Sequence, residues 1–359
     1  MATVPGLSGV QNERSITPSK GKVKVTVHVT RMILVIYRYH NSDIRNAMMK
    51  EELRFLGLDV GGTKCAAVLG CAAGNILARK QWPSQAQRGP GAMIDELVSH
   101  GRALMMQAGG VQAIGVSIGG PLDAVRGIIY SPPNLPGWDG INLKEMLAQR
   151  FDMPTETIRV QHDAAACALA EYHWGAGKES RRLIYLTCGT GFGAGLVIDG
   201  QPYYGAGGRS GEFSHVRYQD SGLEAFGKAG SLEAFAAGSA LSKIAVWKYP
   251  HRRWSPDGAA PTGAQVSQLA GGGDAEAREV LRINARAVGH GAAILADMLF
   301  PDCILLGSLA FYLGEDWLAE VRRAFVEEAL PDAAKLCRLI PAGLGAQLGD
   351  LSALVTAIG

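Results

Sequence analysis

Two short stretches with a shared pattern decide the fold. Residues 56–63 read LGLDVGGT, and residues 185–191 read YLTCGTG. Each is an apolar run that ends in a turn of glycine and threonine and is followed by a second apolar run. The Gly-Thr pairs of the two turns lie 127 residues apart, at 62–63 and 189–190. Because this spacing is about one domain length, it predicts two similar halves, each with one strand–turn–strand unit.

The segments around these turns alternate between strand and helix patterns. Apolar runs predict strands at residues 55–60, 65–70, 113–118, 158–161, 183–188, 194–198 and 303–306. Helical periodicity or alanine content predicts helices at residues 94–107, 141–151, 164–172, 231–249, 275–300 and 317–330. This alternation predicts an α/β protein.

Length and composition limit the class of protein further. The chain has 359 residues, of which 47% are hydrophobic and 19% are charged, so it can build a large core in two lobes. The longest apolar run near the start is residues 32–37, far below the ~20 residues of a membrane span, and no signal-peptide pattern precedes it. Six scattered cysteines without a C-x-x-C pair indicate reduced thiols, and we expect a cytoplasmic protein without a membrane partner.

Charge is distributed unevenly along the chain. Residues 1–50 contain eight Lys or Arg and two acids, whereas the other 309 residues hold 27 basic and 31 acidic groups, a net charge of −4. A mildly acidic body argues against nucleic acid as a partner. Residues 1–53 form an N-terminal extension with two open interpretations. We favour an extension that is disordered or not native, with Met48 or Met49 as the true start; the alternative is a basic arm or an extra edge strand at residues 22–29.

The two glycine turns are candidate phosphate sites. Without a Cβ, backbone N–H groups can approach an anion closely, and the threonine hydroxyl adds a donor. Asp59 precedes the first turn and could hold Mg²⁺, directly or through water, because this ion prefers carboxylate and phosphate oxygens. Neither turn matches the Walker or dinucleotide patterns, and a tight hairpin turn is the structural alternative for each.

These stretches resemble the motifs of the ROK family (repressors, uncharacterised reading frames and sugar kinases) in the hexokinase–actin superfamily. The resemblance runs in order through residues 58–64, 119–121, 131–138, 163, 187–193, 211–215 and 230–233, and it extends from about residue 54 to the C-terminus. It implies a two-lobed, actin-like (ribonuclease H-like) ATPase fold, with a mixed sheet and flanking helices in each lobe. The N-terminal lobe would span residues 54–165 and the C-terminal lobe residues 166–359, with the last helix returning to the N-terminal lobe.

The resemblance also implies a set of functional residues. Asp163 would be the catalytic base, which needs to lie within hydrogen-bond reach of the attacking hydroxyl. The implied sugar ligands are Gly120, Asn134, His162, Glu212, His215 and Glu233. The implied nucleotide contacts are Asp59, Gly61, Gly62, Thr63, Lys64, Gly189, Thr190, Gly191 and Gly307.

Each candidate has a structural alternative. Asp163 could be a helix N-cap, a position that aspartate suits equally well. Glu212 and Glu233 could be solvated surface acids, and His215 an ordinary loop histidine. Asn134 lies in a Pro/Gly turn, where asparagine is common for the turn itself.

Two departures from the family pattern matter. His162 stands where the family usually has asparagine, which bears on the identity of the sugar. Many relatives bind a structural zinc through three cysteines and the histidine at position 215, but this chain has Glu224, Phe226 and Ser231 in place of those cysteines. A Cys₃His zinc site is therefore excluded. We expect Glu224 to orient His215 in place of the metal.

The resemblance predicts an ATP- and Mg²⁺-dependent sugar kinase and a homodimer. The γ-phosphoryl group would pass to a hydroxyl of a hexose, with glucose favoured, or of an N-acetylhexosamine. Two alternatives stay open: a sugar-responsive transcriptional regulator of the same family, and a sugar-binding protein without catalysis. The regulators carry a helix-turn-helix domain in front, for which residues 1–50 are too short and too strand-like.

Overall fold

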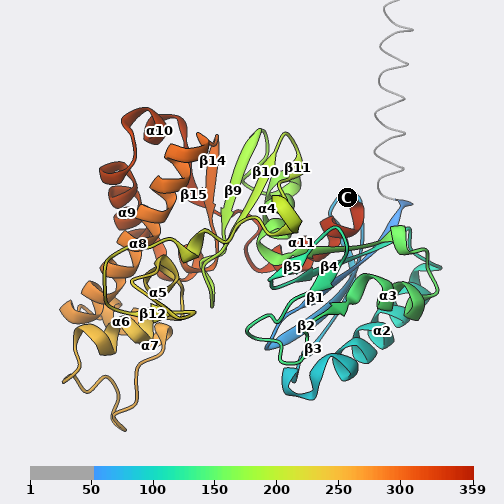
Figure 1. Cartoon of the computed structure of the whole chain (residues 1–359), viewed down its shortest axis with the longest axis horizontal. Helices are drawn as coiled ribbons and strands as arrows, with labels where there is room; N and C mark the ends of the chain where they lie inside the picture. Colours follow the sequence, from blue (N-terminus) through green and yellow to red (C-terminus); the bar gives the residue numbers. More distant parts are fainter. Residues whose placement is uncertain (1–51) are drawn as a thin grey trace, which may run out of the picture. The chain divides into compact units, whose positions relative to one another are not determined.

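A computed structural model describes residues 52–359, so the expectations for residues 1–51 lie outside the described part. This part contains two five-stranded sheets (Figure 1). The first has the order β3-β2-β1-β4-β8, built from β1 (Arg54–Val60), β2 (Lys64–Cys71), β3 (Ile76–Pro83), β4 (Ala113–Ile118) and β8 (Ile158–His162). The second has the order β11-β10-β9-β14-β15, built from β9 (Arg182–Leu186), β10 (Ala194–Ile198), β11 (Gln201–Pro202), β14 (Cys303–Leu306) and β15 (Arg338–Pro341).

The two sheets repeat one plan. In each, a three-stranded antiparallel meander (β1-β2-β3, β9-β10-β11) is extended on the other side of its first strand by two parallel strands (β4 and β8, β14 and β15). The turns singled out in the sequence connect β1 to β2 and β9 to β10. The predicted internal repeat and the two-lobed α/β fold are therefore confirmed.

Helices cover the first sheet on both faces. Helices α2 (Gly89–Ala108) and α3 (Leu143–Phe151) pack on one face, where Leu56, Leu58 and Ile94 share a core. Helix α11 (Leu348–Ile358), at the C-terminal end of the chain, packs on β1 and β4 of the other face. There Gly115 has no room for a side chain, because a Cβ would lie 2.1 Å from the backbone nitrogen of Ala357. The glycine allows the helix to approach the strand closely.

Each lobe has one helix that packs on the sheet of the other lobe. Helix α4 (Asp163–Trp174) follows the last strand of the first sheet but packs mainly on β9 and β10 of the second, while α11 follows the second sheet and packs on the first. The two helices also contact each other and share a core with Phe55, Leu183 and Leu305. The predicted lobe boundary after residue 165 falls within α4 and stays a prediction.

The far face of the second sheet is covered by a helical layer. This layer comprises α5 (Leu232–Ala236), α6 (Ala240–Lys248), α7 (Gly263–Gly271), α8 (Ala275–Leu299), α9 (Ser308–Glu328) and α10 (Pro331–Leu336). Three short strands, β5 (Leu122–Asp123), β6 (Ile128–Ile129) and β7 (Ile141–Asn142), form a small sheet, and β12 (Glu224–Ala225) with β13 (Lys228–Ala229) forms a hairpin. Within residues 52–359 no helix is both long and apolar enough to cross a membrane.

The single helix predicted over residues 231–249 is wrong. The structure divides it into α5 and α6, with extended backbone at Ala237. At the break, the N–H of Gly238 donates to the carbonyl of Gly189 at 2.7 Å. This contact with the second glycine turn replaces a hydrogen bond within the helix. The pattern of apolar residues does not indicate the break, because the contact joins segments far apart in the chain.

Other predicted boundaries were also wrong. Helix α9 joins two helical segments at Gly314, whose backbone is not helical; the second segment corresponds to the predicted helix at 317–330, whereas the segment from Ser308 was missed. Helix α2 begins at Gly89 rather than at residue 94, because Pro90 is tolerated in a first helical turn. Strand β9 ends at Leu186, since Thr187 already belongs to the turn. Strand β3 was missed because it is a largely exposed, polar edge strand without a continuous apolar run.

Candidate active site

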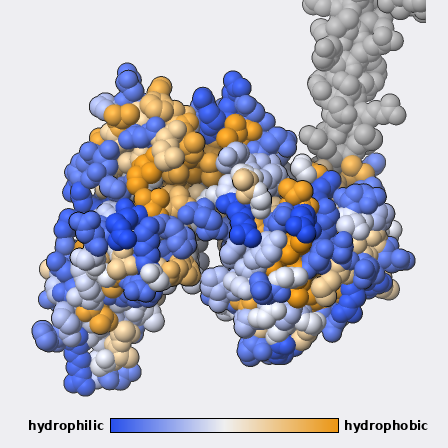
Figure 2. Space-filling view, in the orientation of Figure 1, coloured by the Kyte–Doolittle hydropathy of each residue, from blue (hydrophilic) through white to orange (hydrophobic). Residues whose placement is uncertain are grey.

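One cavity of about 830 Å³ collects residues from both lobes. The N-terminal lobe contributes Gly119, Gly120, Asn134, His162 and Asp163. The C-terminal lobe contributes Gly189, Thr190, Gly191, Glu212, His215 and Glu233. Figure 2 shows the surface of the described part hollowed between the regions that carry the two sheets. The cavity thus joins all the predicted sugar ligands, the predicted base and the second glycine turn.

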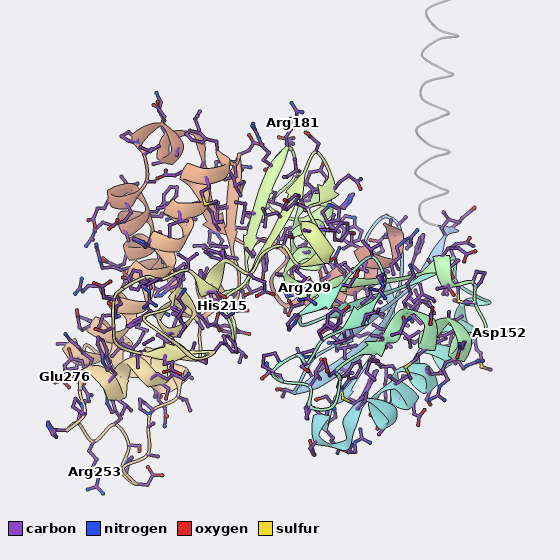
Figure 3. The ribbon with its side chains drawn as sticks, viewed as in Figure 1. Asp152, Arg181, Arg209, His215, Arg253 and Glu276 are labelled. Carbon is purple, nitrogen blue, oxygen red and sulfur yellow. The ribbon has the colours of Figure 1, made fainter. Side chains whose placement is uncertain are left out.

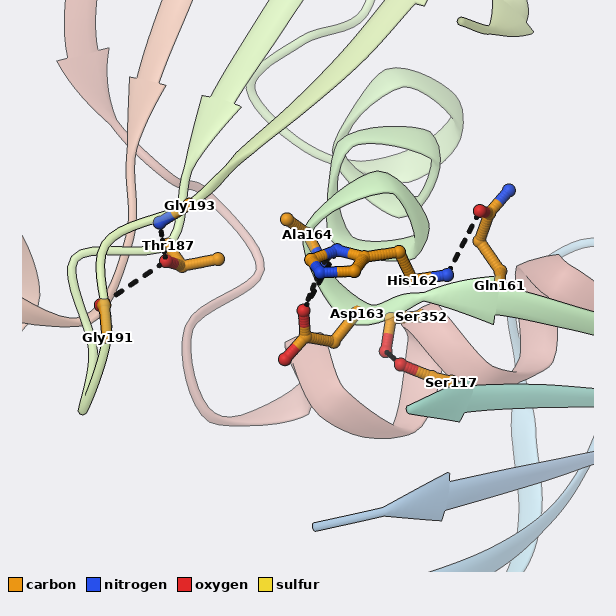
Figure 4. A network of polar contacts seen from close by, with 9 residues as sticks. All are labelled: Ser117, Gln161, His162, Asp163, Ala164, Thr187, Gly191, Gly193 and Ser352. Atoms are coloured by element: carbon orange, nitrogen blue, oxygen red, sulfur yellow. Dashed lines mark hydrogen bonds and ion pairs between the residues drawn. The ribbon is translucent and has the colours of Figure 1, made fainter. Parts of the chain in front are cut away.

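Asp163 is the first residue of α4, and its side chain is 49% exposed in the cavity wall. The N-cap position belongs to His162, whose Nδ1 lies 3.2 Å from both the Ala164 nitrogen and Asp163 Oδ1 (Figure 4). Asp163 Oδ1 also accepts a hydrogen bond from the Ala164 N–H at 2.6 Å. His162 therefore caps the start of α4. The hydrogen bond from the Ala164 N–H holds the Asp163 carboxylate in place at the cavity wall.

Glu233 connects the predicted sugar ligands to the second turn. It is buried at the start of α5, and its Oε2 accepts a hydrogen bond from the N–H of Phe192 at 2.9 Å. The pKa of Glu233 is raised, because burial has the largest effect. The N–H of Phe192, the hydroxyl of Ser214 and the ammonium of Lys243 lower this pKa by a smaller amount. The structure therefore rules out a solvated surface acid at this position.

Glu212 precedes the short helical turn Phe213–His215, which His215 ends, and both side chains belong to exposed residues of the cavity wall. The ring of His215 lies against the ring of Phe226, with centroids 5.5 Å apart, and its backbone carbonyl accepts a hydrogen bond from Lys228. The guanidinium carbon of Arg209 lies 4.6 Å from the ring centroid of Tyr130, a contact that links the C-terminal lobe to the N-terminal lobe. Figure 3 labels Arg209.

The expected role of Glu224 is wrong. This residue is exposed on β12, and among residues 52–359 no hydrogen bond joins its carboxylate to His215. The contact with the His215 ring comes from Phe226, two residues further along the chain. The hairpin places a ring rather than a carboxylate beside the histidine.

The first glycine turn does not reach the cavity wall. The Gly61 N–H is used within the turn, where it donates to the carbonyl of Lys64 at 3.1 Å. Gly62 packs against Asn134, because a Cβ there would lie 2.6 Å from the Asn134 carbonyl oxygen. Since Asn134 lines the cavity, the turn lies directly behind the wall, and its contact with phosphate stays a prediction together with that of Thr63.

Asp59 lies at the carboxyl end of β1 in an acidic environment. Burial raises its pKa to about 7, with further contributions from Asp163 and Asp350 that outweigh those of Lys64 and Arg79. A cation would relieve this accumulation of negative charge. No group of three or more His, Cys, Asp or Glu side chains in the described part is arranged to hold a metal ion. Mg²⁺ does not need one, because it is commonly held by one or two carboxylates together with phosphate oxygens and water.

A second cavity of about 740 Å³ borders the second turn. It shares Gly189, Thr190, Ser239 and Ser308 with the first cavity, and its own part is lined by Leu241, Leu309, Tyr312 and Leu313 among others. An apolar cavity next to a glycine turn suits a nucleobase with its phosphates directed at the turn. The predicted nucleotide contact Gly307 does not line this cavity, but its neighbour Ser308 does.

Other wall residues carry no sequence motif and were not predicted, notably Lys243 and Tyr312. Lys243 is exposed on α6 in the wall of the 830 Å³ cavity, and its positive charge lowers the pKa of Glu233. Both residues lie within helices whose local patterns carry no motif. Lys243 reaches its cavity wall because the chain breaks before α6, and Tyr312 reaches its wall because α9 begins at Ser308, ahead of Gly314.

Two sheets with the same strand order, exchanged helices and a cavity between the lobes define the actin-like class of two-lobed α/β proteins. The chain belongs to the ROK family, because the model of that family matches residues 55–358.

Individual relatives are similar along nearly the same length. The chain is 31% identical to a glucokinase of Streptomyces coelicolor over 314 residues, which cover 84% of this chain and 95% of the relative. Among solved structures, the ROK hexokinase of Thermus thermophilus superposes with a TM-score of 0.74 at 30% identity, covering 85% of this chain and 98% of the other. A ROK family glucokinase of Streptomyces griseus in complex with glucose and AMPPNP gives a TM-score of 0.71 at 28% identity, with coverage of 84% and 98%.

Proposed function

We propose that this protein is an ATP-dependent sugar kinase that phosphorylates a hydroxyl of a hexose, with glucose favoured, or of an N-acetylhexosamine. The single cavity that joins Asp163, Glu212, His215 and Glu233 to the second glycine turn carries this proposal. The similarity to glucokinases, one of them solved with glucose and AMPPNP, supports the choice of sugar and of ATP.

Each group has a role in the proposed reaction. Asp163 accepts the proton of the attacking hydroxyl; in a loose transition state this proton can leave late, so an ordinary carboxylate suffices. Glu212, His215 and Glu233 bind the remaining sugar hydroxyls and fix the ring for in-line attack. Thr190 and its neighbouring glycines bind the phosphates of ATP, and the apolar cavity binds its adenine base. Asp59 would hold Mg²⁺, which supplies neutralisation of phosphate charge when bound.

A coupled ADP-release assay over a panel of hexoses and N-acetylhexosamines tests the proposal. We expect turnover of at least one sugar and a loss of at least ~10²-fold in kcat for Asp163→Asn. Asp152→Asn is the matched control, because Asp152 is an exposed aspartate at the C-cap of α3 and lines neither cavity. An unchanged kcat in Asp163→Asn would remove this residue from the mechanism.

A regulatory function is the second candidate. A xylose repressor of Caldicellulosiruptor bescii is 30% identical over 220 residues, 59% of this chain and 54% of the repressor. A ROK family transcriptional regulator has the same fold, with a TM-score of 0.75 at 19% identity and coverage of 86% of this chain and 78% of the regulator. Sugar binding by calorimetry without ADP release from any sugar in the panel would favour this candidate or a silent sugar-binding protein.

A further inference from the structure

The hairpin β12–β13 ends in an unusual turn. Pairing of Glu224 with Ala229 and of Ala225 with Lys228 leaves a loop of two residues, Phe226 and Gly227. Both have positive φ values, 51° and 73°. Two-residue loops of this kind strongly prefer Asn-Gly or Asp-Gly, because a side chain with a bulky Cβ substituent is strained in the left-handed region. This backbone conformation therefore disfavours phenylalanine at position 226.

Packing does not account for the phenylalanine either. The Phe226 side chain is 59% exposed, so it gains little from burial in a core. An uncommon backbone conformation that neither the turn nor the core explains is a reason to look for a function.

Phe226 lies at the wall of the 830 Å³ cavity. Phe226 lines this cavity together with Glu212, His215 and Glu233. Its ring and the His215 ring have centroids 5.5 Å apart and an interplanar angle of 31°. Flat aromatic surface thus lies beside a hydrogen-bonding side chain, His215, in a cavity that Glu212 and Glu233 also line.

We propose that Phe226 is a substrate-binding residue whose ring packs against the C–H face of a hexopyranose. The proposal deepens the proposed function and rests on it for the class of ligand. A pyranose ring with equatorial hydroxyls presents axial C–H groups on its faces and hydroxyls around its edge. Such a ligand uses both parts of the wall: the C–H face removes apolar surface of Phe226 from water, and the edge hydroxyls pair with Glu212, His215 and Glu233.

The sharpest test separates stability from sugar binding. Phe226→Asn gives the turn the residue it prefers and removes the ring. We expect the melting temperature to rise by about 1–3 °C and the Kd for the best sugar of the panel to rise about tenfold, or about 1.4 kcal/mol. Sugar Kd is measured by titration calorimetry without nucleotide, and stability by differential scanning calorimetry. Phe226→Tyr keeps the ring and should bind sugar within about twofold of the wild type.

Phe300→Asn is the matched control. Phe300 is also a phenylalanine with positive φ, 43° at the C-cap of α8, and its side chain is 39% exposed, but it lines neither cavity. Asparagine is accepted at such a cap, so this variant should keep or gain stability without a change in sugar Kd.

The outcomes are distinct. Unchanged sugar Kd in Phe226→Asn overturns the proposal, as does a Kd for Phe226→Tyr that rises as far as that of Phe226→Asn, or a wild type that binds no sugar of the panel. A wild type that binds sugar but releases no ADP contradicts the kinase function alone, and the Kd values of the variants then still decide on Phe226.

Discussion

The backbone N–H of Phe192 donates to Oε2 of Glu233 at 2.9 Å. Phe192 follows the second glycine turn, and Glu233 is a predicted sugar ligand at the start of α5. A cavity residue that would bind the acceptor sugar is therefore hydrogen-bonded to the turn that would bind the donor phosphates.

Replacement of Glu233 by glutamine should weaken sugar binding without unfolding the protein. The amide oxygen can still accept from Phe192, but the charge that strengthens hydrogen bonds to sugar hydroxyls is lost. Hydrogen bonds to charged groups contribute about 1.5–3 kcal/mol, so the sugar Kd should rise between about 10- and 100-fold. Calorimetric titration measures it, and Glu224→Gln, an exposed carboxylate without a bond to His215, is the control. An equal effect of the two variants would contradict the assignment of Glu233.

Asp59 should make stability depend on pH. Its folded-state pKa is raised to about 7 from an ordinary value of 3.8. Between these values the folded protein keeps a proton that the unfolded chain has lost, so the free energy of unfolding falls as pH rises from about 4 to about 7. Asp59→Asn removes this penalty. At pH 8 the variant should be more stable than the wild type by up to about 4 kcal/mol, and at pH 4 the difference should be small.

Urea unfolding of both proteins at the two pH values measures this difference. A stability gain that is the same at pH 4 and pH 8 would show that ionisation of Asp59 is not its cause. The same variant should lose kinase activity, since Asp59 is the residue expected to hold Mg²⁺.

Glu171 should be the most costly of the buried acids to remove. It is fully buried in α4, and its carboxylate accepts hydrogen bonds from the backbone N–H groups of Ala176, Gly343 and Leu344 at 2.8–3.0 Å. These bonds connect α4 to the loop that leads toward α11. Glu171→Ala removes the charged acceptor of three part-buried N–H groups, so the free energy of unfolding should fall by about 3 kcal/mol.

Chemical denaturation measures the effect, and Glu156→Ala, at an exposed position of the short helical turn Thr155–Thr157, is the control. Glu171→Gln should recover part of the loss because its amide oxygen can accept. Two alanine variants of equal stability would show that the three N–H groups find other partners.

Much of the fold was predictable because its signals are local. The runs that became β1, β2, β4 and β8 are apolar and bounded by glycine or polar residues, and the spacing of the two turns indicated the repeated sheet plan. Asp163, Glu212, His215 and Glu233 were each identified from their motifs, and the structure brings them into one cavity. The roles of these residues in catalysis and binding stay predictions.

Local pattern by itself determined the strand–turn–strand units and the α/β class, because each depends on neighbours within a few positions in the chain. The candidate residues came from the resemblance of the sequence to the motifs of the ROK family. Tertiary structure decided the exchange of α4 and α11 between the sheets, the break between α5 and α6, and the position of Phe226 beside His215. Each of these depends on contact between segments far apart in the chain or on the backbone of a turn. A periodicity of apolar residues shows which face of a helix or strand is buried, but not which distant backbone packs against it.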